Sequence, residues 1–164
     1  MERLFALHIL RELFRRGICR GGAAEMEIQM INSERREARE YAFTILFQYK
    51  FHPDDMREVL DDFMLEHPDV AQSDYIKDVV LGTVEHIDEI DGKINEFSKG
   101  RRVERISLAG LTLIRIAVYE MFYRDDIPPV VSIDEAVTLT KKYDDEQVVP
   151  FVNGILGNIK NSIS

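Results

Sequence analysis

Residues 108–123, LAGLTLIRIAVYEMFY, constrain the fold of this chain more than any other segment. Arg115 and Glu120 are the only charged residues in it, and apolar residues occupy nearly every side of a helix drawn through it. A helix that is apolar on most sides must be covered by other elements, so we expect this one at the centre of the protein. Arg115 and Glu120 then need partners, because an unpaired charge is strongly unfavourable in a protein interior.

The remaining segments supply helices to cover it. Apolar residues recur every three or four positions, and no stretch alternates with the period of two that a half-buried strand requires. Besides 108–123, the predicted helices are residues 33–51, 54–66, 73–98, 132–143 and one from about 149, with a short turn near 101–106. Caps support these bounds: Ser107, an S-x-x-E capping box at Ser132 and Glu135, and a Lys99-Gly100 stop. We therefore predict an all-α fold of about seven helices.

The first thirty residues differ from the rest. They combine a short amphipathic pattern with Gly17, Gly21 and Gly22, which interrupt it. The pattern lacks the continuous apolar core and the cleavage site of a targeting peptide. We expect residues 1–30 to be an extension outside the fold, with Met30 as a candidate first residue, and residues 31–164 to form the folded domain.

Composition limits the setting and the class of protein. At 164 residues the chain suits one domain, and no segment is apolar for long enough to cross a membrane. A single cysteine, Cys19, excludes an internal disulfide framework, and a reducing cytoplasmic location is the default expectation. The net charge is −9, and residues 31–164 hold 16 basic against 26 acidic residues. That balance argues against nucleic acid unless the cations are grouped on one surface.

Cations are grouped along residues 33–50, which form a helix with two adjacent stripes. The apolar stripe consists of Ala38, Ala42, Ile45, Leu46 and Tyr49. The second stripe consists of Arg36, Arg39, Phe43, Phe47 and Lys50. Cations that pair with phosphates, beside rings that stack on bases, are typical of single-stranded RNA binding. The alternative is that the rings widen the core contact and the arginines are solvated.

No catalytic arrangement is recognisable in the sequence. The four histidines show neither i, i+4 pairing nor a metal-binding motif, and Cys19 lies in the peripheral segment. The glycines of FVNGILGN lie within a helical pattern and lack the strand–turn–helix context of a phosphate-binding loop. We expect neither enzymatic activity nor a cofactor or metal.

Four blocks in order, RREARE, RIAVYE, SIDEAVTLTKKY and PFVNGIL, closely resemble the NusB family of transcription antitermination factors. The resemblance covers about residues 34–160 and implies an all-α fold of two packed helical bundles. It also implies binding to boxA, a short single-stranded leader in rRNA transcripts, together with the ribosomal protein NusE. The pair brings RNA polymerase into a complex that reads through terminators. Relatives occur as monomers and as homodimers.

The resemblance, the stripe and a second group of cations at Lys99, Arg101, Arg102 and Arg105 together give two sets of candidate residues. The RNA-binding set is Arg35, Arg36, Arg39, Phe43, Phe47, Lys50, Arg101 and Arg102. The resemblance places a NusE-binding set at Tyr119, Glu120, Tyr143, Glu146, Gln147 and Phe151. The chain departs from the family pattern in several places: Glu37 stands among the arginines, and Gln147 and Pro150 replace charged residues of relatives. The tryptophan that the family often carries before the connector is also absent, and Lys99-Gly100 stands there.

Two alternatives remain open at this level. Arg115 and Glu120 can be internal braces of the central helix instead of contacts. The net charge and Glu37 favour a second function, an acidic protein–protein adaptor whose RNA binding is weak or supplied by its partner.

Overall fold

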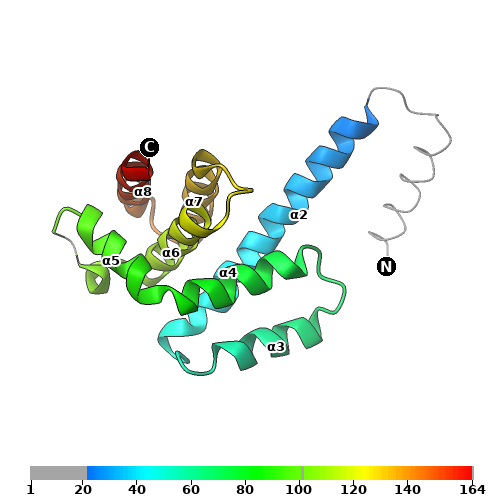
Figure 1. Ribbon diagram of the computed structural model, residues 1–164, viewed down its shortest axis with the longest axis horizontal. Helices are drawn as coiled ribbons and strands as arrows, with labels where there is room; N and C mark the ends of the chain where they lie inside the picture. Colours follow the sequence, from blue (N-terminus) through cyan, green and yellow to red (C-terminus); the bar gives the residue numbers. More distant parts are fainter. Residues whose placement is uncertain (1–21, 101, 164) are drawn as a thin grey trace. The chain divides into compact units, whose positions relative to one another are not determined.

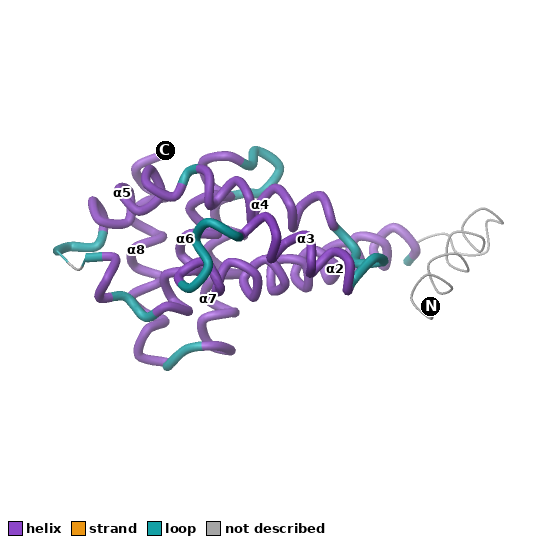
Figure 2. Tube along the Cα trace, turned by 90° about the horizontal axis from the view of Figure 1, so that it is seen from below, coloured by secondary structure: helices purple, strands orange, loops and turns teal. Residues whose placement is uncertain are grey.

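The computed structural model describes residues 22–100 and 102–163, and this part of the chain is helical without β-strands (Figures 1 and 2). The α-helices are α2 Ala23–Leu46, α3 Met56–Glu66, α4 Ser73–Glu85, α5 Ile87–Phe97, α6 Leu108–Tyr123, α7 Pro129–Tyr143 and α8 Val149–Ile163. Three short 3-10 helices are η1 Phe47–Lys50, η2 Val103–Arg105 and η3 Glu146–Val148. The all-α prediction is confirmed.

The chain divides into two units, residues 1–36 and 37–164. In the first unit the described residues are Gly22 and the opening turns of α2, whose apolar side chains Met26, Ile28 and Ile31 are exposed. The second unit holds the rest of α2 and every later element. The predicted extension comprises residues 1–30. Its residues 1–21 lie outside the described part of the chain, whereas its residues 23–30 belong to α2.

Helix α6 is the centre of the second unit, as its composition predicts. It packs against α4, α5, α7 and α8, which surround it in Figure 1. Leu113, Ile114 and Ile116 are almost completely buried. Burying side chains of this size stabilises the fold by about 1.5–3 kcal/mol each. The predicted cap is confirmed, because the Ser107 hydroxyl accepts the Gly110 N–H at 3.3 Å.

The first predicted helix is longer than its sequence signals indicate. It starts at Ala23 instead of at Ser33, which lies inside α2. Residues 23–32 are mostly Ala, Glu, Met, Gln and Ile, and they include neither Gly nor Pro to stop a helix. Because the helix runs through them, Ser33 does not mark its start, although serine is a common N-cap residue. At its other end, α2 tightens into η1 before Pro53.

The predicted helix 73–98 is two helices, α4 and α5, with a break at His86. Its φ of −102° and ψ of 20° leave the helical region, although its N–H still bonds to the Gly82 carbonyl at 3.0 Å. The His86 ring stacks on Tyr123 of α6, with ring centroids 4.2 Å apart. The apolar spacing continues across the break because both helices bury residues against α6, so periodicity alone does not reveal it.

Helix α7 begins at Pro129, not at the predicted capping box. Proline suits the first helical position, since its missing N–H would have no partner there. Ser132 and Glu135 therefore lie within the helix, and their side chains are used in tertiary contacts.

Other predicted bounds are confirmed. Gly100 has a φ of 85°, the left-handed conformation of a helix stop, and η2 is the short turn expected near residues 101–106. Helix α8 starts at Val149 as predicted. None of the helices in the described part of the chain is long and apolar enough to span a membrane.

Candidate nucleic-acid interface

Arg39, a predicted RNA contact, is buried in the second unit. Its side chain is 3% exposed, and its Nε donates to Oε1 of Glu120 at 2.8 Å. Its Nη1 lies 3.6 Å from Oε2 of Glu135 on α7. Burial alone would lower the pKa of the Arg39 guanidinium, but attraction by Glu120 and the hydrogen bond to it hold that pKa above its ordinary value.

Glu120, a predicted partner contact on α6, is fully buried. Besides Arg39, its carboxylate accepts a hydrogen bond from the Tyr75 hydroxyl on α4 and another from Ser132 Oγ on α7 at 2.6 Å. We call Arg39, Tyr75, Glu120, Ser132 and Glu135 the buried clamp. It links four helices, so burial assigns Arg39 and Glu120 a bracing role in place of the predicted RNA and NusE contacts. This agrees with the internal-brace alternative for Glu120.

Arg115 is the other charge of the central helix, and it also has a partner. Its Nε and Nη2 donate to the two carboxylate oxygens of Asp91 on α5, at 2.8 and 2.7 Å. This two-point pairing of a planar guanidinium with a carboxylate is the stronger kind of ion pair. Both charges of α6 are therefore internal braces.

Phe43 is 4% exposed and belongs to the hydrophobic core. Its ring contacts Phe47 with centroids 5.8 Å apart and Tyr143 at 4.9 Å. Phe47 is 36% exposed and Tyr143 is 42% exposed, so both rings that contact Phe43 reach solvent. Phe43 supports the exposed rings and is not itself open to a base, which corrects its predicted role.

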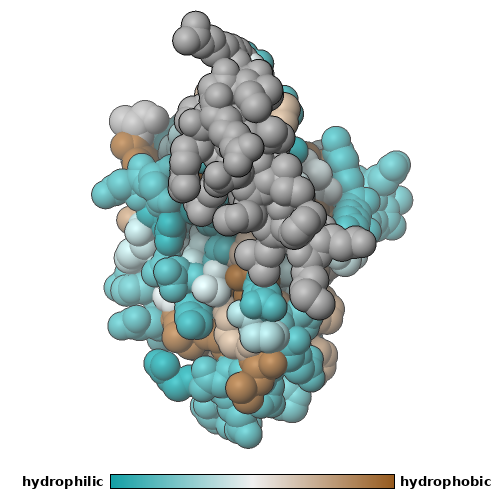
Figure 3. Space-filling view, turned by 90° about the vertical axis from the view of Figure 1, so that its right-hand side faces the viewer, coloured by the Kyte–Doolittle hydropathy of each residue, from teal (hydrophilic) through white to brown (hydrophobic). Residues whose placement is uncertain are grey.

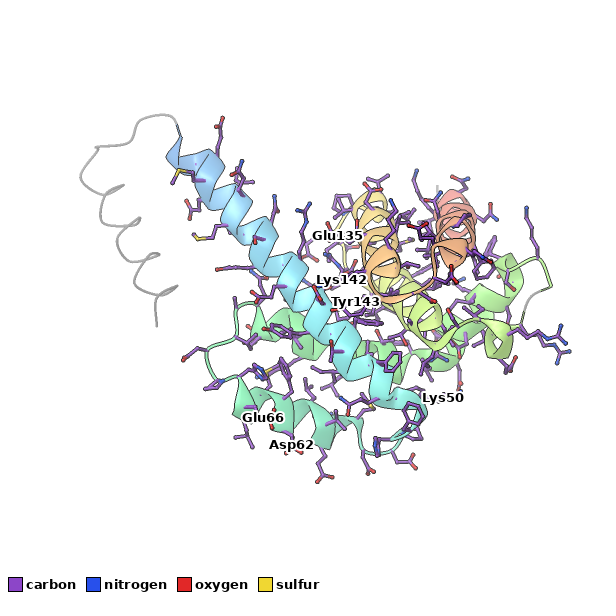
Figure 4. All side chains as sticks on the ribbon, turned by 180° about the vertical axis from the view of Figure 1, so that it is seen from behind. Lys50, Asp62, Glu66, Glu135, Lys142 and Tyr143 are labelled. Atoms are coloured by element: carbon purple, nitrogen blue, oxygen red, sulfur yellow. The ribbon has the colours of Figure 1, made fainter. Side chains whose placement is uncertain are left out.

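Glu40 joins α2 to the end of α7 beside these rings. Its Oε1 accepts from Lys142 Nζ and from the Tyr143 hydroxyl, which lie together in Figure 4. Partial burial would raise the pKa of Glu40, but the Lys142 and Tyr143 hydrogen bonds lower it below its ordinary value. The same bonds raise the pKa of Lys142 and of Tyr143, so the pair is held as carboxylate and ammonium.

We call Glu40, Phe47, Lys142 and Tyr143, together with Lys50 at the end of η1, the α2–α7 surface. Its two rings and two cations are exposed, Glu40 is its one carboxylate, and Figure 4 labels Lys50 apart from Lys142 and Tyr143. Rings can stack on unpaired bases and ammonium groups can pair with phosphates, so the surface has the chemistry that a single strand needs. Tyr143 was predicted to contact NusE, but in the structure it lies beside Phe43, one of the rings predicted to contact RNA.

The other predicted RNA contacts lie elsewhere. Arg35 is half-buried and Arg36 is exposed, and both belong to the first unit. Arg102 is exposed in the connector that precedes η2. Arg101 lies outside the described residues.

Tyr119, predicted for NusE, is an internal residue at 5% exposure. Its hydroxyl donates to Asp78 Oδ1 at 3.0 Å, and burial and that bond raise its pKa. A Cβ added at Gly82 would lie 2.2 Å from the Tyr119 hydroxyl, so Gly82 is required for this close approach. Among the remaining predicted partner residues, Glu146 and Gln147 are exposed on η3, and Phe151 is half-buried at the start of α8.

Glu40 and the pairing that it makes were not predicted from the sequence. Lys141 and Lys142 stand out there as adjacent cations, but nothing local connects Lys142 to a glutamate 102 residues away. Tyr75 and Ser132 were missed for the same reason. In the described part of the chain, no three His, Cys, Asp or Glu side chains converge to hold a metal ion.

Where Figure 3 shows described residues that grey atoms do not cover, most are hydrophilic, and hydrophobic residues form small patches among them.

Comparison with known proteins gives one family. The model of the NusB family matches residues 36–161. The transcription antitermination protein NusB of Acetivibrio thermocellus is 44% identical over 127 residues, which cover 76% of this chain and 87% of that protein. The NusB of Clostridium acetobutylicum is 37% identical over 130 residues, covering 78% and 96%.

Solved structures give the same result. NusB of T. maritima has a TM-score of 0.72 at 33% identity, covering 77% of this chain and 90% of that one. A crystal structure of the antitermination factors NusB and NusE in complex with double-stranded RNA has a TM-score of 0.71 at 27% identity, covering 79% and 98%.

Proposed function

The chain belongs to the NusB family, and on that premise we propose that it is a transcription antitermination factor. It binds boxA-type single-stranded RNA of the rRNA leader together with the ribosomal protein NusE. The pair supports RNA polymerase in reading through terminators. The function is one of binding and recruitment, and no catalytic residue is assigned.

The α2–α7 surface carries the RNA part of this proposal. Phe47 and Tyr143 are the exposed rings on which bases stack, and Lys50 and Lys142 pair with phosphates. The buried Phe43 fixes the spacing of the rings, since it contacts both. A preorganised aromatic pair loses little conformational freedom on binding.

The predicted contacts that remain exposed or half-buried keep their proposed roles. Arg35 and Arg36 in the first unit and Arg102 before η2 contact phosphates. Glu146, Gln147 and Phe151 form the part of the surface that faces NusE. Arg39, Phe43, Tyr119 and Glu120 are withdrawn from both sets because they are buried.

The adaptor alternative is supported by a specific observation. Burial removes Arg39 and Phe43 from the RNA contacts, and Glu40 offsets part of the charge of Lys142. An acidic chain with fewer RNA contacts would bind NusE first and RNA through the pair.

A titration separates the two functions. Fluorescence anisotropy of a boxA-like RNA is followed with the full chain alone, with NusE alone and with both, at two salt concentrations. Direct RNA contact by this chain predicts binding by the chain alone that is tighter with NusE and falls as salt rises, since about 0.7 counterions are released per phosphate contact with a single strand. The adaptor function predicts RNA binding by the pair but none by the chain alone. Absence of RNA binding by the pair at both salt concentrations would refute the proposal.

Matched variants locate the RNA contact. Phe47→Ala should weaken RNA binding by about 1–3 kcal/mol, the usual contribution of one stacked base. Leu65→Ala is the control, because Leu65 is also an exposed apolar side chain of the second unit. NusE binding that survives while RNA binding is lost supports separate RNA and NusE surfaces; an equal loss in both variants contradicts the placement of RNA on the α2–α7 surface.

A further inference from the structure

A groove of about 490 Å³ lies between the end of α2 and α3, and neither the RNA nor the NusE assignment uses it. Tyr41 and Gln48 contribute from the α2 side, and Asp62, Phe63, Glu66 and His67 from the α3 side. The α3 side, with Asp62 and Glu66, is labelled in Figure 4. The volume is in the range of sites that take one or two side chains or a small ligand.

The floor of the groove is aromatic. The rings of Phe63 and His67 are stacked, with centroids 4.3 Å apart and an angle of 17° between their planes. Tyr41 contacts both, at 5.1 Å from Phe63 and 5.7 Å from His67. His67 Nδ1 lies 3.0 Å from the Phe63 carbonyl, which fixes the orientation of the imidazole ring. The three rings therefore form one contiguous aromatic group in the lining of the groove.

The rim is acidic. Asp62 and Glu66 stand one helical turn apart on α3, and both are exposed. Among the described residues neither carboxylate has an ion-pair partner, and no Lys or Arg lines the groove. The surroundings have the same sign, since residues 54–69 contain seven carboxylates and one cation, Arg57.

Aromatic faces beside unpaired carboxylates select a cation. A guanidinium stacks on rings through cation–π attraction and pairs with a carboxylate at two points, so arginine fits both features better than lysine. A phosphate backbone does not fit, because its charge has the same sign as the rim.

We propose that the groove between α2 and α3 is a docking site for an arginine-bearing segment of a protein partner. The arginine lies over the Tyr41–Phe63–His67 floor and pairs with Asp62 and Glu66. The site is separate from the α2–α7 surface, so the chain can hold RNA and a basic protein segment at once. The proposal stands whether or not RNA binds to the α2–α7 surface.

The test uses the full chain and a short fluorescein-labelled Gly/Ser peptide that carries a pair of arginines. Anisotropy gives its affinity at low and physiological ionic strength. The variant Asp62→Asn/Glu66→Gln should weaken binding by about ten-fold, the loss expected when the charged partners of a guanidinium are removed. The matched control Glu58→Gln/Asp61→Asn removes the same charge from the same helix, outside the groove, and should change affinity by less than about two-fold.

Two further readouts distinguish docking from general attraction. Amide and aromatic NMR shifts on adding the peptide should be largest at Tyr41, Phe63 and His67, and a lysine version of the peptide should shift them less. Equal weakening by the two double variants, or shifts spread over the acidic surface, would overturn the proposal. Shifts at the groove produced by single-stranded RNA in place of the peptide would overturn it as well.

Discussion

Two glutamates of this protein hold a cation and a tyrosine hydroxyl in similar ways but in opposite surroundings. Glu120 in the buried clamp accepts from Arg39, Tyr75 and Ser132, and it is fully buried. Glu40 on the α2–α7 surface accepts from Lys142 and Tyr143, close to solvent. Arg39 and Glu40 are neighbours in the sequence, so α2 contributes to both clusters within one turn.

The difference shows that burial decides what a charge cluster contributes. In the buried clamp, removal of one side chain leaves its charged or polar partners buried without a hydrogen-bonding group or water to replace it. This strongly lowers the free energy of unfolding. On the surface, water replaces a lost partner, so such pairs contribute little to stability and are available for binding. The clamp is therefore a stability element, whereas the α2–α7 surface is the part of the molecule that we propose for RNA binding.

Breaking the clamp should have the largest effect. Arg39→Ala leaves Glu120 charged and fully buried, and we expect the free energy of unfolding to fall by about 3–5 kcal/mol. Chemical denaturation followed by circular dichroism measures the loss. Arg102→Ala is the control, because Arg102 is exposed. A loss under about 1 kcal/mol, the range of an exposed ion pair, would mean that Arg39 does not brace the interior.

A double replacement tests whether the clamp acts as a pair. Arg39→Leu/Glu120→Leu removes both charges, and its loss should be smaller than the sum of the two single losses by about 0.5–3 kcal/mol. It should not restore full stability, because the Tyr75 and Ser132 hydroxyls lose their acceptor. Additive single and double losses would contradict the direct coupling of Arg39 and Glu120.

A substitution on the α2–α7 surface should change the affinity for RNA more than the stability of the protein. Glu40→Gln removes a carboxylate beside Lys142, and we expect boxA-like RNA to bind more tightly by up to about five-fold, the scale of one charge–charge contact in water. The melting temperature should fall only slightly, because the exposed pairing of Glu40 contributes little to the free energy of unfolding. Weaker RNA binding by this variant would show that Glu40 positions Lys142 and Tyr143 for the RNA.

The smallest effect is a pH dependence of stability at the same residue. The pKa of Glu40 is lowered below its ordinary value of 4.5 in the folded state. Its contribution is therefore fully present above that ordinary value and is lost as pH falls through the lower folded value. Urea unfolding of the parent protein and of Glu40→Gln should differ by a small constant amount at neutral pH, and the difference should shrink as pH falls below the ordinary value of 4.5. A difference that grows on acidification would contradict the lowered pKa.

Much of the helical frame could be predicted from the sequence. The near-uniform apolar composition of residues 108–123 identified α6, and its Ser107 cap is present. The errors share one cause, which is that tertiary contacts override local signals. His86 breaks a continuous apolar pattern while stacking on Tyr123, and Ser132, which resembles a cap, bonds to Glu120 from inside α7.

The candidate site divides in the same way. The basic and aromatic stripe of residues 33–50 was visible in the sequence, but the prediction treated Arg36, Arg39, Phe43, Phe47 and Lys50 as one surface. In the structure, Phe47 and Lys50 are exposed, whereas Arg39 and Phe43 are buried. Periodicity defines a helix face only to within a turn, and both sides of that boundary here carry cations and rings.

The sequence by itself determined the all-α class, the central helix and the family of this protein, because apolar spacing and ordered motif blocks are local properties of the chain. Only the tertiary structure decided that Arg39 faces inward and Glu40 outward. Their partners, Glu120 and Lys142, lie 81 and 102 residues away. The free energy of a polar side chain depends on whether such a distant partner meets it out of water, and no local pattern encodes that meeting.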